Sequence, residues 1–253
     1  MKRFFVKPEE ISESDGSIRG SQVNHIRNVL RMKSGEHAIL LDGSGYEYEV
    51  AFTMLTPDHV DFDILKKTQA NYESPIRLMV AQAFLKDKKM DFLVRHLTEM
   101  GMCTWIPLFT EHAVPRLEGN KVTTRVKRWQ TISSEAVKQC RRAIVPEICT
   151  PLPFRKWIAA GPEADLKLAF WEKETVPLKA VAPEKSPSIR SVLVLIGPEG
   201  GFSDAEMHLA RSAGFLTASI GPRILKAETA AIAICALAQY LYGDMGGVME
   251  KKP

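Results

Sequence analysis

Alternation between apolar and polar residues is the clearest pattern in the first 70 residues of the chain. Residues 46–55 and 59–65 alternate with a period of two, which is typical of strands with one buried face. Residues 35–43 form an apolar run closed by Asp-Gly turn chemistry, and residues 3–6 form a shorter run that ends before Pro8. These four segments predict a small β-barrel.

One predicted helix interrupts the strands, at residues 21–32. Its apolar face is formed by Val23, Ile26, Val29 and Leu30. Its polar side carries His25, Arg27, Asn28 and Arg31. Two interpretations stay open for this region: a barrel with an ordinary solvated helix, or a barrel of the size of an RNA-binding accessory module.

The pattern changes at residues 66–75, a polar stretch without apolar periodicity, where we place a domain boundary. We therefore expect one domain at residues 1–70 and a second at residues 76–253. In the second domain, residues 76–84, 104–109 and 166–172 are strand-like, and Pro107 marks an edge or irregular position. A helix capped by Asp87 separates the first two strands and ends at Gly101. This alternation predicts an α/β domain with a mostly parallel sheet.

The longest predicted helix, residues 121–140, has one apolar and one basic side. The basic side carries Lys121, Arg125, Lys127, Arg128 and Lys138, and Arg141 and Arg142 follow directly. A basic helix face is most often simply solvated. The positive charges clustered at its end raise the alternative of contact with phosphates.

Two later segments share one plan, in which an apolar strand stops at Gly-Pro and a helix follows. The first is residues 192–203, where Ser203 and Glu206 form a capping box, and the second is residues 218–230. Adjacent strand ends with glycine-rich loops predict a pocket for a nucleotide-like ligand. Neither the dinucleotide-binding GxGxxG motif nor the GxxxxGK[ST] phosphate loop is present, so tight turns without a ligand remain the alternative. The last helix, residues 227–238, is small and apolar all round, which predicts burial on several sides.

Composition indicates the class of protein and its compartment, but it does not indicate the function. The chain has 253 residues, 45% of them apolar, with no apolar run of membrane-spanning length and no signal-peptide pattern at its start. Four scattered cysteines favour reduced thiols in a cytoplasmic protein, and nothing suggests a metal site. The net charge of +4 permits an anionic partner but does not require one.

The IGPEGGFS segment at residues 196–203, paired with IGPRILKAETA at residues 220–230, resembles the SPOUT class of methyltransferases. Within that class it is most similar to the family that methylates uracil N3 in 16S ribosomal RNA. Further matching segments are residues 3–6, 25–31, 90–91, 98–101, 135–139 and 146–148, with Lys86 and Arg142. The chain departs from the family's usual residues at His112, Lys226 and the pair Cys140-Arg141.

The resemblance implies a PUA-like barrel followed by a SPOUT domain with a trefoil knot at roughly residues 190–245. It also implies a homodimer and S-adenosylmethionine as the cofactor. The residues expected to bind the cofactor are Phe170, Trp171, Glu172, Ile196, Gly197, Gly200, Gly201, Ile220, Gly221, Leu225 and Thr229. On this basis a valine at Gly201 is expected to block cofactor binding without unfolding the protein.

The chemistry of the expected reaction indicates catalytic candidates. Uracil N3 becomes nucleophilic only when its proton leaves, which calls for a carboxylate base and a cation to stabilise the developing charge. Glu199 and Glu228 are the candidate bases and Arg223 the candidate stabiliser, although Glu228 equally suits a helix N-terminus that only needs a negative charge. The expected ribosomal RNA contacts are Arg3, His25, Arg27, Arg31, Lys86 and Arg142.

Two other functions remain possible at this stage. The first is methylation of a ribose 2′-hydroxyl in transfer or ribosomal RNA, against which stands the lack of an early asparagine-led N-x-G-type motif. The second is RNA binding without catalysis. The intact glycines at 197, 200, 201 and 221 argue against the second, since an inactive site has no reason to keep such loops.

Overall fold

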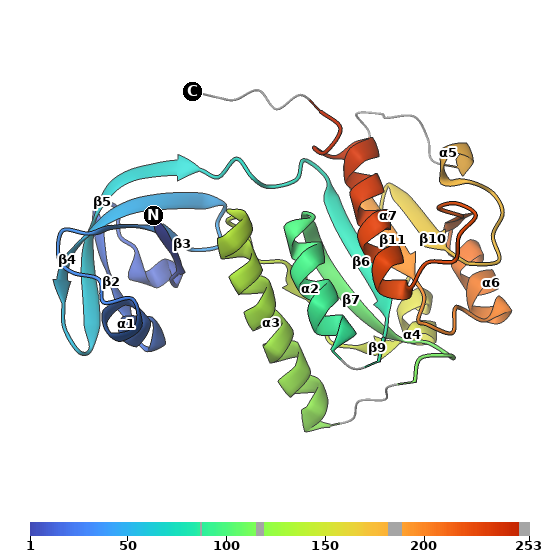
Figure 1. Cartoon of the computed structure of the whole chain (residues 1–253), viewed down its shortest axis with the longest axis horizontal. Helices are drawn as coiled ribbons and strands as arrows, with labels where there is room; N and C mark the ends of the chain where they lie inside the picture. The colour runs from blue at the N-terminus through green and yellow to red at the C-terminus, as the bar shows by residue number, and fades with distance from the viewer. Residues whose placement is uncertain (87, 115–118, 182–188, 248–253) are drawn as a thin grey trace. The chain divides into compact units, whose positions relative to one another are not determined.

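The computed structural model describes residues 1–86, 88–114, 119–181 and 189–247, and the chain forms two compact units (Figure 1). The first unit is Met1–Glu73 with Val137–Val145, and the second is Ser74–Ala136 with Pro146–Pro253. The return of residues 137–145 to the first unit had no sequence signal, because residues 137–140 belong to the long basic helix and residues 141–145 follow it directly. Asp87, the expected helix cap, lies outside the described residues.

A curled five-stranded sheet forms the first unit, in the order β1-β3-β4-β5-β2. Its strands are β1 (Lys2–Phe5), β2 (Asp15–Arg19), β3 (His37–Leu41), β4 (Tyr46–Leu55) and β5 (His59–Gln69). β1 pairs with β3 in parallel and the other pairs are antiparallel. Two register irregularities between β4 and β5 promote the curl. Residues 66–69, predicted to begin the linker, instead continue β5 beside β4, because cross-strand pairing there overrides their polar composition.

The helix of the first unit is shorter and less regular than predicted. A 3₁₀ turn, η1 (Pro8–Glu10), precedes it, and α1 (Ser21–Asn24) continues as a π-helical turn, η2 (His25–Val29). Leu30 N–H donates to the His25 carbonyl at 2.9 Å, the i→i+5 bond of a π turn. The wider turn changes the direction of the side chains at its own C-terminal end. Val29 is therefore 61% exposed, and its predicted place on the buried face was wrong.

The second unit has a parallel sheet in the order β12-β10-β11-β6-β7-β8, with β9 also paired to β7. Its strands are β6 (Arg77–Ala83), β7 (Met102–Phe109), β8 (Glu147–Ile148), β9 (Leu152–Pro153), β10 (Leu166–Phe170), β11 (Ser191–Ile196) and β12 (Leu216–Ala218). All its described pairings are parallel, as predicted. β8 and β9 pair with β7 at Thr104–Trp105 and Leu108–Phe109. Pro107 lies between these pairings, at the irregular position that was expected.

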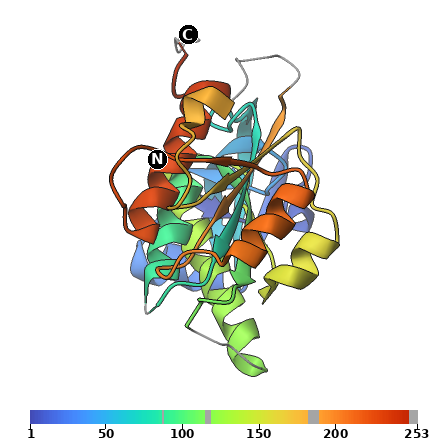
Figure 2. The same ribbon diagram turned by 90° about the vertical axis from the view of Figure 1, so that its right-hand side faces the viewer.

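Helices cover both faces of this sheet (Figure 2). They are α2 (Lys89–Glu99), α3 (Asn120–Cys140), α4 (Phe154–Ala159), α5 (Leu178–Val181), α6 (Asp204–Ser212) and α7 (Ala227–Tyr242). The core on one face includes buried residues of α2, α3 and α7, and the core on the other includes buried residues of α4 and α6. α4, α5 and the two-residue strands were not predicted, since such short segments carry too little periodicity.

Helix α7 places its small residues inward and leaves part of its surface open. Ala231, Cys235 and Ala238 are buried within the core that also includes residues of α2, β6 and β11. Leu237 and Tyr240 remain 37% and 61% exposed. The expectation of burial on several sides is therefore only partly met within one copy of the chain.

The strand order identifies the edge where a ligand is expected. β6 and β11 are neighbours, and the chain continues from β6 toward β7 on one side, whereas β10 and β12 lie on the other. Such a switch in strand order opens a crevice at the carboxyl ends of the two strands. After β12 at the sheet edge, the chain turns back and places α7 near β6 and β11. The predicted trefoil knot requires the C-terminal segment to turn back in this way.

Candidate functional site

The first Gly-Pro loop follows β11 and leads into α6. Gly201 N–H donates to the Pro198 carbonyl at 3.0 Å, closing a tight turn. The predicted capping box is confirmed, because Glu206 N–H donates to Ser203 Oγ at 3.3 Å and Ser203 N–H donates to Glu206 Oε2 at 3.1 Å. The other oxygen of the buried Glu206 accepts Glu111 N–H at 2.9 Å. These bonds hold the loop and the segment after β7 together.

The three glycines of this loop are packed against the protein itself. A Cβ atom at Gly201 would lie 2.2 Å from Glu172 Oε1, and Gly201 has a φ of +69°. A Cβ at Gly200 would approach His112 Cβ at 3.0 Å, and one at Gly197 would approach the Phe202 ring at 3.2 Å. The close neighbours of these three glycines are therefore other parts of the loop and the side chains that support it.

The second Gly-Pro loop is more open. Gly221 has a φ of +125°, and an added Cβ would meet no atom within 4 Å. Arg223 is exposed, Ile224 is 89% exposed and Leu225 is half-buried. This loop leaves free space in front of its glycine, which the first loop does not.

A third segment follows β10 and contacts the first loop. Phe170 is buried at the end of the strand, and Glu172 lies beside Gly201. The Trp171 ring has Lys173 Nζ at 5.2 Å and the Arg211 guanidinium at 5.3 Å from its centre. Its indole nitrogen is buried and has no hydrogen-bond partner among the described residues. The structure thus places this predicted wall next to the first loop.

The two Gly-Pro loops meet at one lysine, Lys89, in the first turn of α2. Lys89 Nζ lies 3.1 Å from Glu199 Oε1 of the first loop and 3.3 Å from Glu228 Oε2, in the first turn of α7. The Lys86 backbone N–H also donates to Glu199 Oε1 at 3.2 Å. Glu199, Glu228 and Lys86 were predicted site residues from the sequence, but Lys89 was not. Only the pairing of β6 with β11 brings it to the two carboxylates.

The three charged groups at this site, Glu199, Glu228 and Lys89, have different surroundings. Burial works to raise the pKa of Glu199, but hydrogen bonds from its own backbone N–H, Lys89 and the Lys86 N–H outweigh it and hold that pKa below its usual value. The hydrogen bond to Glu199, with support from Glu228, raises the pKa of Lys89. Glu228 Oε2 is buried, and Lys89 Nζ at 3.3 Å is its ion-pair partner among the described residues.

Two further residues, Gln82 and His112, contact the first Gly-Pro loop and were not predicted to do so. Gln82, fully buried at the end of β6, donates through Nε2 to the Gly197 carbonyl at 3.2 Å, and its Oε1 has no partner. His112 Nδ1 lies 3.1 Å and 3.2 Å from the Gly200 and Gly201 carbonyl oxygens, so the protonated nitrogen donates to the loop. A buried glutamine in an apolar strand was the one available signal for Gln82.

Most of the predicted RNA contacts lie on the first unit, but two of them are occupied by internal partners. Arg3 pairs with Glu47, and its side chain is only 14% exposed. The Arg142 side chain is 4% exposed and pairs with Glu73 through Nε at 2.9 Å and an outer nitrogen at 2.8 Å. The structure therefore contradicts phosphate contact by Arg142 and leaves Arg3 little freedom for it. His25 and Arg31 are exposed, Arg27 is half-buried, and Lys86 is exposed on the second unit.

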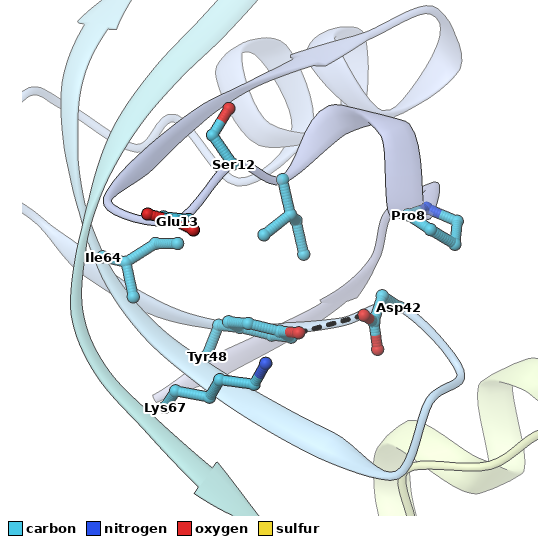
Figure 3. Close-up of a pocket in the computed structure, with 8 residues that line it drawn as sticks. Pro8, Ser12, Glu13, Asp42, Tyr48, Ile64 and Lys67 are labelled. Atoms are coloured by element: carbon cyan, nitrogen blue, oxygen red, sulfur yellow. Dashed lines mark hydrogen bonds between the residues drawn. The ribbon is translucent and has the colours of Figure 1, made fainter.

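A cleft of about 330 Å³ opens in the first unit (Figure 3). Its lining residues are Pro8, Ile11, Ser12, Glu13, Asp42, Tyr48, Ile64 and Lys67. Tyr48 O–H donates to Asp42 Oδ2 at 3.1 Å, and Lys67 Nζ lies 5.2 Å from the centre of the Tyr48 ring. The cleft contains none of the predicted site residues, and two of its polar groups, Tyr48 and Asp42, bond to each other.

Other classes of site find no support in the described parts of the chain. Among these residues there is no group of histidine, cysteine or acidic side chains placed to hold a metal ion. Cys103, Cys140, Cys149 and Cys235 are all free thiols. A search of the described helices finds none long and apolar enough to cross a membrane.

Comparison with known proteins gives consistent matches along the chain. A family model described as an RNA methyltransferase domain matches residues 72–239, and one described as an RNA methyltransferase PUA domain matches residues 18–65. The protein named ribosomal RNA small subunit methyltransferase E from Buchnera aphidicola (subsp. Schizaphis graminum) is 32% identical, over 90% of this chain and 92% of its own length. The protein of the same name from Bacillus subtilis is 29% identical, over 96% of this chain and 100% of its own.

Two solved structures resemble the whole fold. A putative methyltransferase from Legionella pneumophila, in complex with bound cofactor SAM, has a TM-score of 0.86 at 30% identity and covers 96% of this chain and 98% of its own. A ribosomal RNA small subunit methyltransferase E from Neisseria gonorrhoeae, bound to S-adenosyl methionine, has the same TM-score and identity. It covers 97% of this chain and 99% of its own.

Proposed function

We propose a specific reaction for this chain, which belongs to the ribosomal RNA small subunit methyltransferase E family of RNA methyltransferases: methylation of uracil N3 in 16S ribosomal RNA. Membership makes the chain an S-adenosylmethionine-dependent RNA methyltransferase and confirms the predicted fold class, a SPOUT domain preceded by a PUA-like barrel. The observation that best supports the finer reaction is the meeting of Glu199 and Glu228 at Lys89, at the carboxyl edge of the parallel sheet.

The residues at this edge suit S-adenosylmethionine. Three buried polar atoms, Gln82 Oε1, Trp171 Nε1 and Glu228 Oε2, lack hydrogen-bond partners among the described residues, as expected where a ligand supplies donors and acceptors. The open side of Gly221 leaves room for such a molecule. When bound, S-adenosylmethionine supplies an activated methyl group on a positively charged sulfur, and the carbon–sulfur electron pair stays on sulfur as the carbon–nitrogen bond forms.

The residues that would hold the cofactor belong to three segments. They are Phe170, Trp171 and Glu172 after β10; Ile196, Gly197, Gly200 and Gly201 after β11; and Ile220, Gly221, Leu225 and Thr229 around the second loop. The first two segments touch directly, through Glu172 and Gly201. They support the cofactor by shaping the backbone around it, since the glycines of the first loop are themselves closely packed.

The protein's part in the chemistry is to remove the uracil N3 proton and stabilise the charge left on the ring. A carboxylate must accept this proton within hydrogen-bond reach. Arg223, exposed on the second loop, has no ion-pair partner among the described residues that would hold it in place, so it is available to a negatively charged ring. Because N3 is hidden in paired RNA, the target nucleotide must be unpaired or turned out of its helix.

RNA is held, in this proposal, by exposed basic residues rather than by every arginine named from the sequence. His25, Arg27 and Arg31 of the barrel unit are accessible or half-accessible, and Lys86 is accessible beside the first loop. We place the protein in the cytoplasm, where ribosomal RNA is found. Contacts of this kind are electrostatic and weaken as salt concentration rises.

One assay tests the proposed reaction. The chain is incubated with labelled S-adenosylmethionine and either small ribosomal subunits or naked 16S RNA, and the labelled nucleoside is then identified. We expect label in N3-methyluridine and in no ribose-methylated nucleoside. A labelled ribose, or a failure to label any ribosomal substrate, would falsify the proposal.

A homodimer is the second part of the proposal, suggested by the family resemblance and by the uncovered part of α7. Leu237, Tyr240 and Met245 leave 37%, 61% and 47% of their surfaces exposed, so a second copy has apolar area to bury. We expect sedimentation to show a dimer for the natural chain and a monomer for Tyr240→Glu. Ala205→Glu, on the exposed side of α6, is the control and should stay dimeric. A monomeric natural chain would contradict the expectation.

A further inference from the structure

Lys89 joins two loops that are far apart in sequence. Its ammonium is 3.1 Å from Glu199 and 3.3 Å from Glu228, and its side chain is one-third exposed. Two carboxylates share this single ammonium, so the three groups carry one excess negative charge when all are ionised. One proton taken up from a substrate by either carboxylate would leave the three groups with no net charge.

The two carboxylates are not equivalent as proton acceptors. Glu199 accepts hydrogen bonds from the Lys86 backbone N–H and from Lys89, both on Oε1. These bonds favour its charged form, and its lowered pKa agrees with them. Glu228 Oε2 is buried, its side chain is 20% exposed, and its ion-pair partner among the described residues is Lys89, at 3.3 Å. Unlike Glu199, it accepts no backbone N–H there, so fewer donors hold it and its carboxylate can turn toward a substrate proton.

We propose that Glu228 is the catalytic base, that Glu199 is the fixed counter-ion of Lys89, and that Lys89 is a positioning residue that holds Glu228 against the reacting nucleotide. This inference rests on the proposed function. The N3–H bond breaks and its proton passes to Glu228, while the electron pair stays on N3 for the new bond to carbon. Lys89 remains paired with Glu199, and the proton leaves to solvent after the product departs.

The test compares four variants of the full-length chain, each nearly isosteric with the natural residue. Glu228→Gln is expected to slow methyl transfer by about 10²–10⁴-fold, the usual contribution of a general base. Its affinity for S-adenosylmethionine, measured by calorimetry, should stay within about threefold. Glu199→Gln should slow transfer by a smaller factor than Glu228→Gln, because it removes the counter-ion of Lys89 and leaves the base in place. Lys89→Met should lose transfer, and Lys89→Arg should restore part of it.

Two further measurements separate catalysis from a structural role. A glutamate that only stabilises the N-terminus of α7 would lower the melting temperature in Glu228→Gln without a selective loss of transfer. In our proposal its melting temperature changes by less than about 3 °C, the effect of 1 kcal/mol or less. Its residual rate should also rise with pH, because hydroxide replaces the missing base. Among the described residues, Lys89 of α2 is the charged group that contacts Glu228, and Glu199 of the first loop shares that ammonium.

The outcomes are distinguishable from those of the proposed function. If Glu228→Gln transfers methyl groups within tenfold of the natural chain, or if Glu199→Gln is the variant that loses transfer, the inference is wrong even where the natural chain produces N3-methyluridine. If the natural chain labels a different position, the proposed function fails. The separate measurement of cofactor affinity then still shows whether Glu228 acts after binding.

Discussion

Arg142→Ala is expected to destabilise the barrel unit by about 3 kcal/mol, because it leaves the carboxylate of Glu73 without its cation. The pair is largely removed from solvent, with side-chain exposures of 4% for Arg142 and 22% for Glu73. Breaking a buried ion pair from one side costs about 3–5 kcal/mol, and the partial exposure of Glu73 favours the lower end. Glu73 Oε1 also accepts the Ala143 and Ile144 backbone N–H groups at 2.9 Å, so the loss should spread to residues 137–145.

Hydrogen exchange measures this effect within the correct unit. The amides of β3 and of residues 143–144 should exchange faster in Arg142→Ala, while those of β6 and β11 should be unchanged. Arg141→Ala is the matched control, since Arg141 is the exposed neighbour and no internal ion pair of the described residues involves it. If Arg142→Ala instead keeps its exchange protection and only weakens RNA binding, the phosphate contact expected from the sequence would be reinstated.

Gly201→Val is expected to lower the melting temperature by about 5–10 °C, and to lose cofactor affinity as a consequence. A φ of +69° costs a residue other than glycine about 1–3 kcal/mol, and a β-branched residue tends to the upper end. The added Cβ would also overlap the Glu172 carboxylate, at 2.2 Å from Oε1. In a chain of this size, each 1 kcal/mol shifts the melting temperature by about 2–4 °C.

A double variant separates the two contributions. Gly201→Val with Glu172→Ala removes the overlap but not the backbone strain, so part of the lost stability should return. Scanning calorimetry on both variants measures it. A Gly201→Val protein that melts like the natural chain but fails to bind S-adenosylmethionine would support the original view, in which the glycine only makes room for the ligand.

The elements with strong periodicity were predictable. β4 spans the same residues in the sequence analysis and in the structure, and the capping box at Ser203 places the start of α6. Both depend on residues that are close in sequence, so a local sequence pattern is enough to predict them. The π turn at residues 25–29 was not predictable in this way, because its pattern of apolar and polar residues is the same as that of an α-helix.

Glu199, Glu228 and the glycine-rich loops could be named as candidates from the sequence itself, because Gly-Pro endings and helix starts are local signals. The ion-pair partners of Arg142 and Lys89 were decided only by the tertiary structure. An arginine beside a basic helix indicates a phosphate contact when only the sequence is known. In the structure Arg142 pairs instead with Glu73, which lies 69 positions away in the sequence. Lys89 stands among other lysines, and the pairing of β6 with β11 brings it to a carboxylate 110 residues away. Charge pairing over such distances depends on strand order, which no local pattern records.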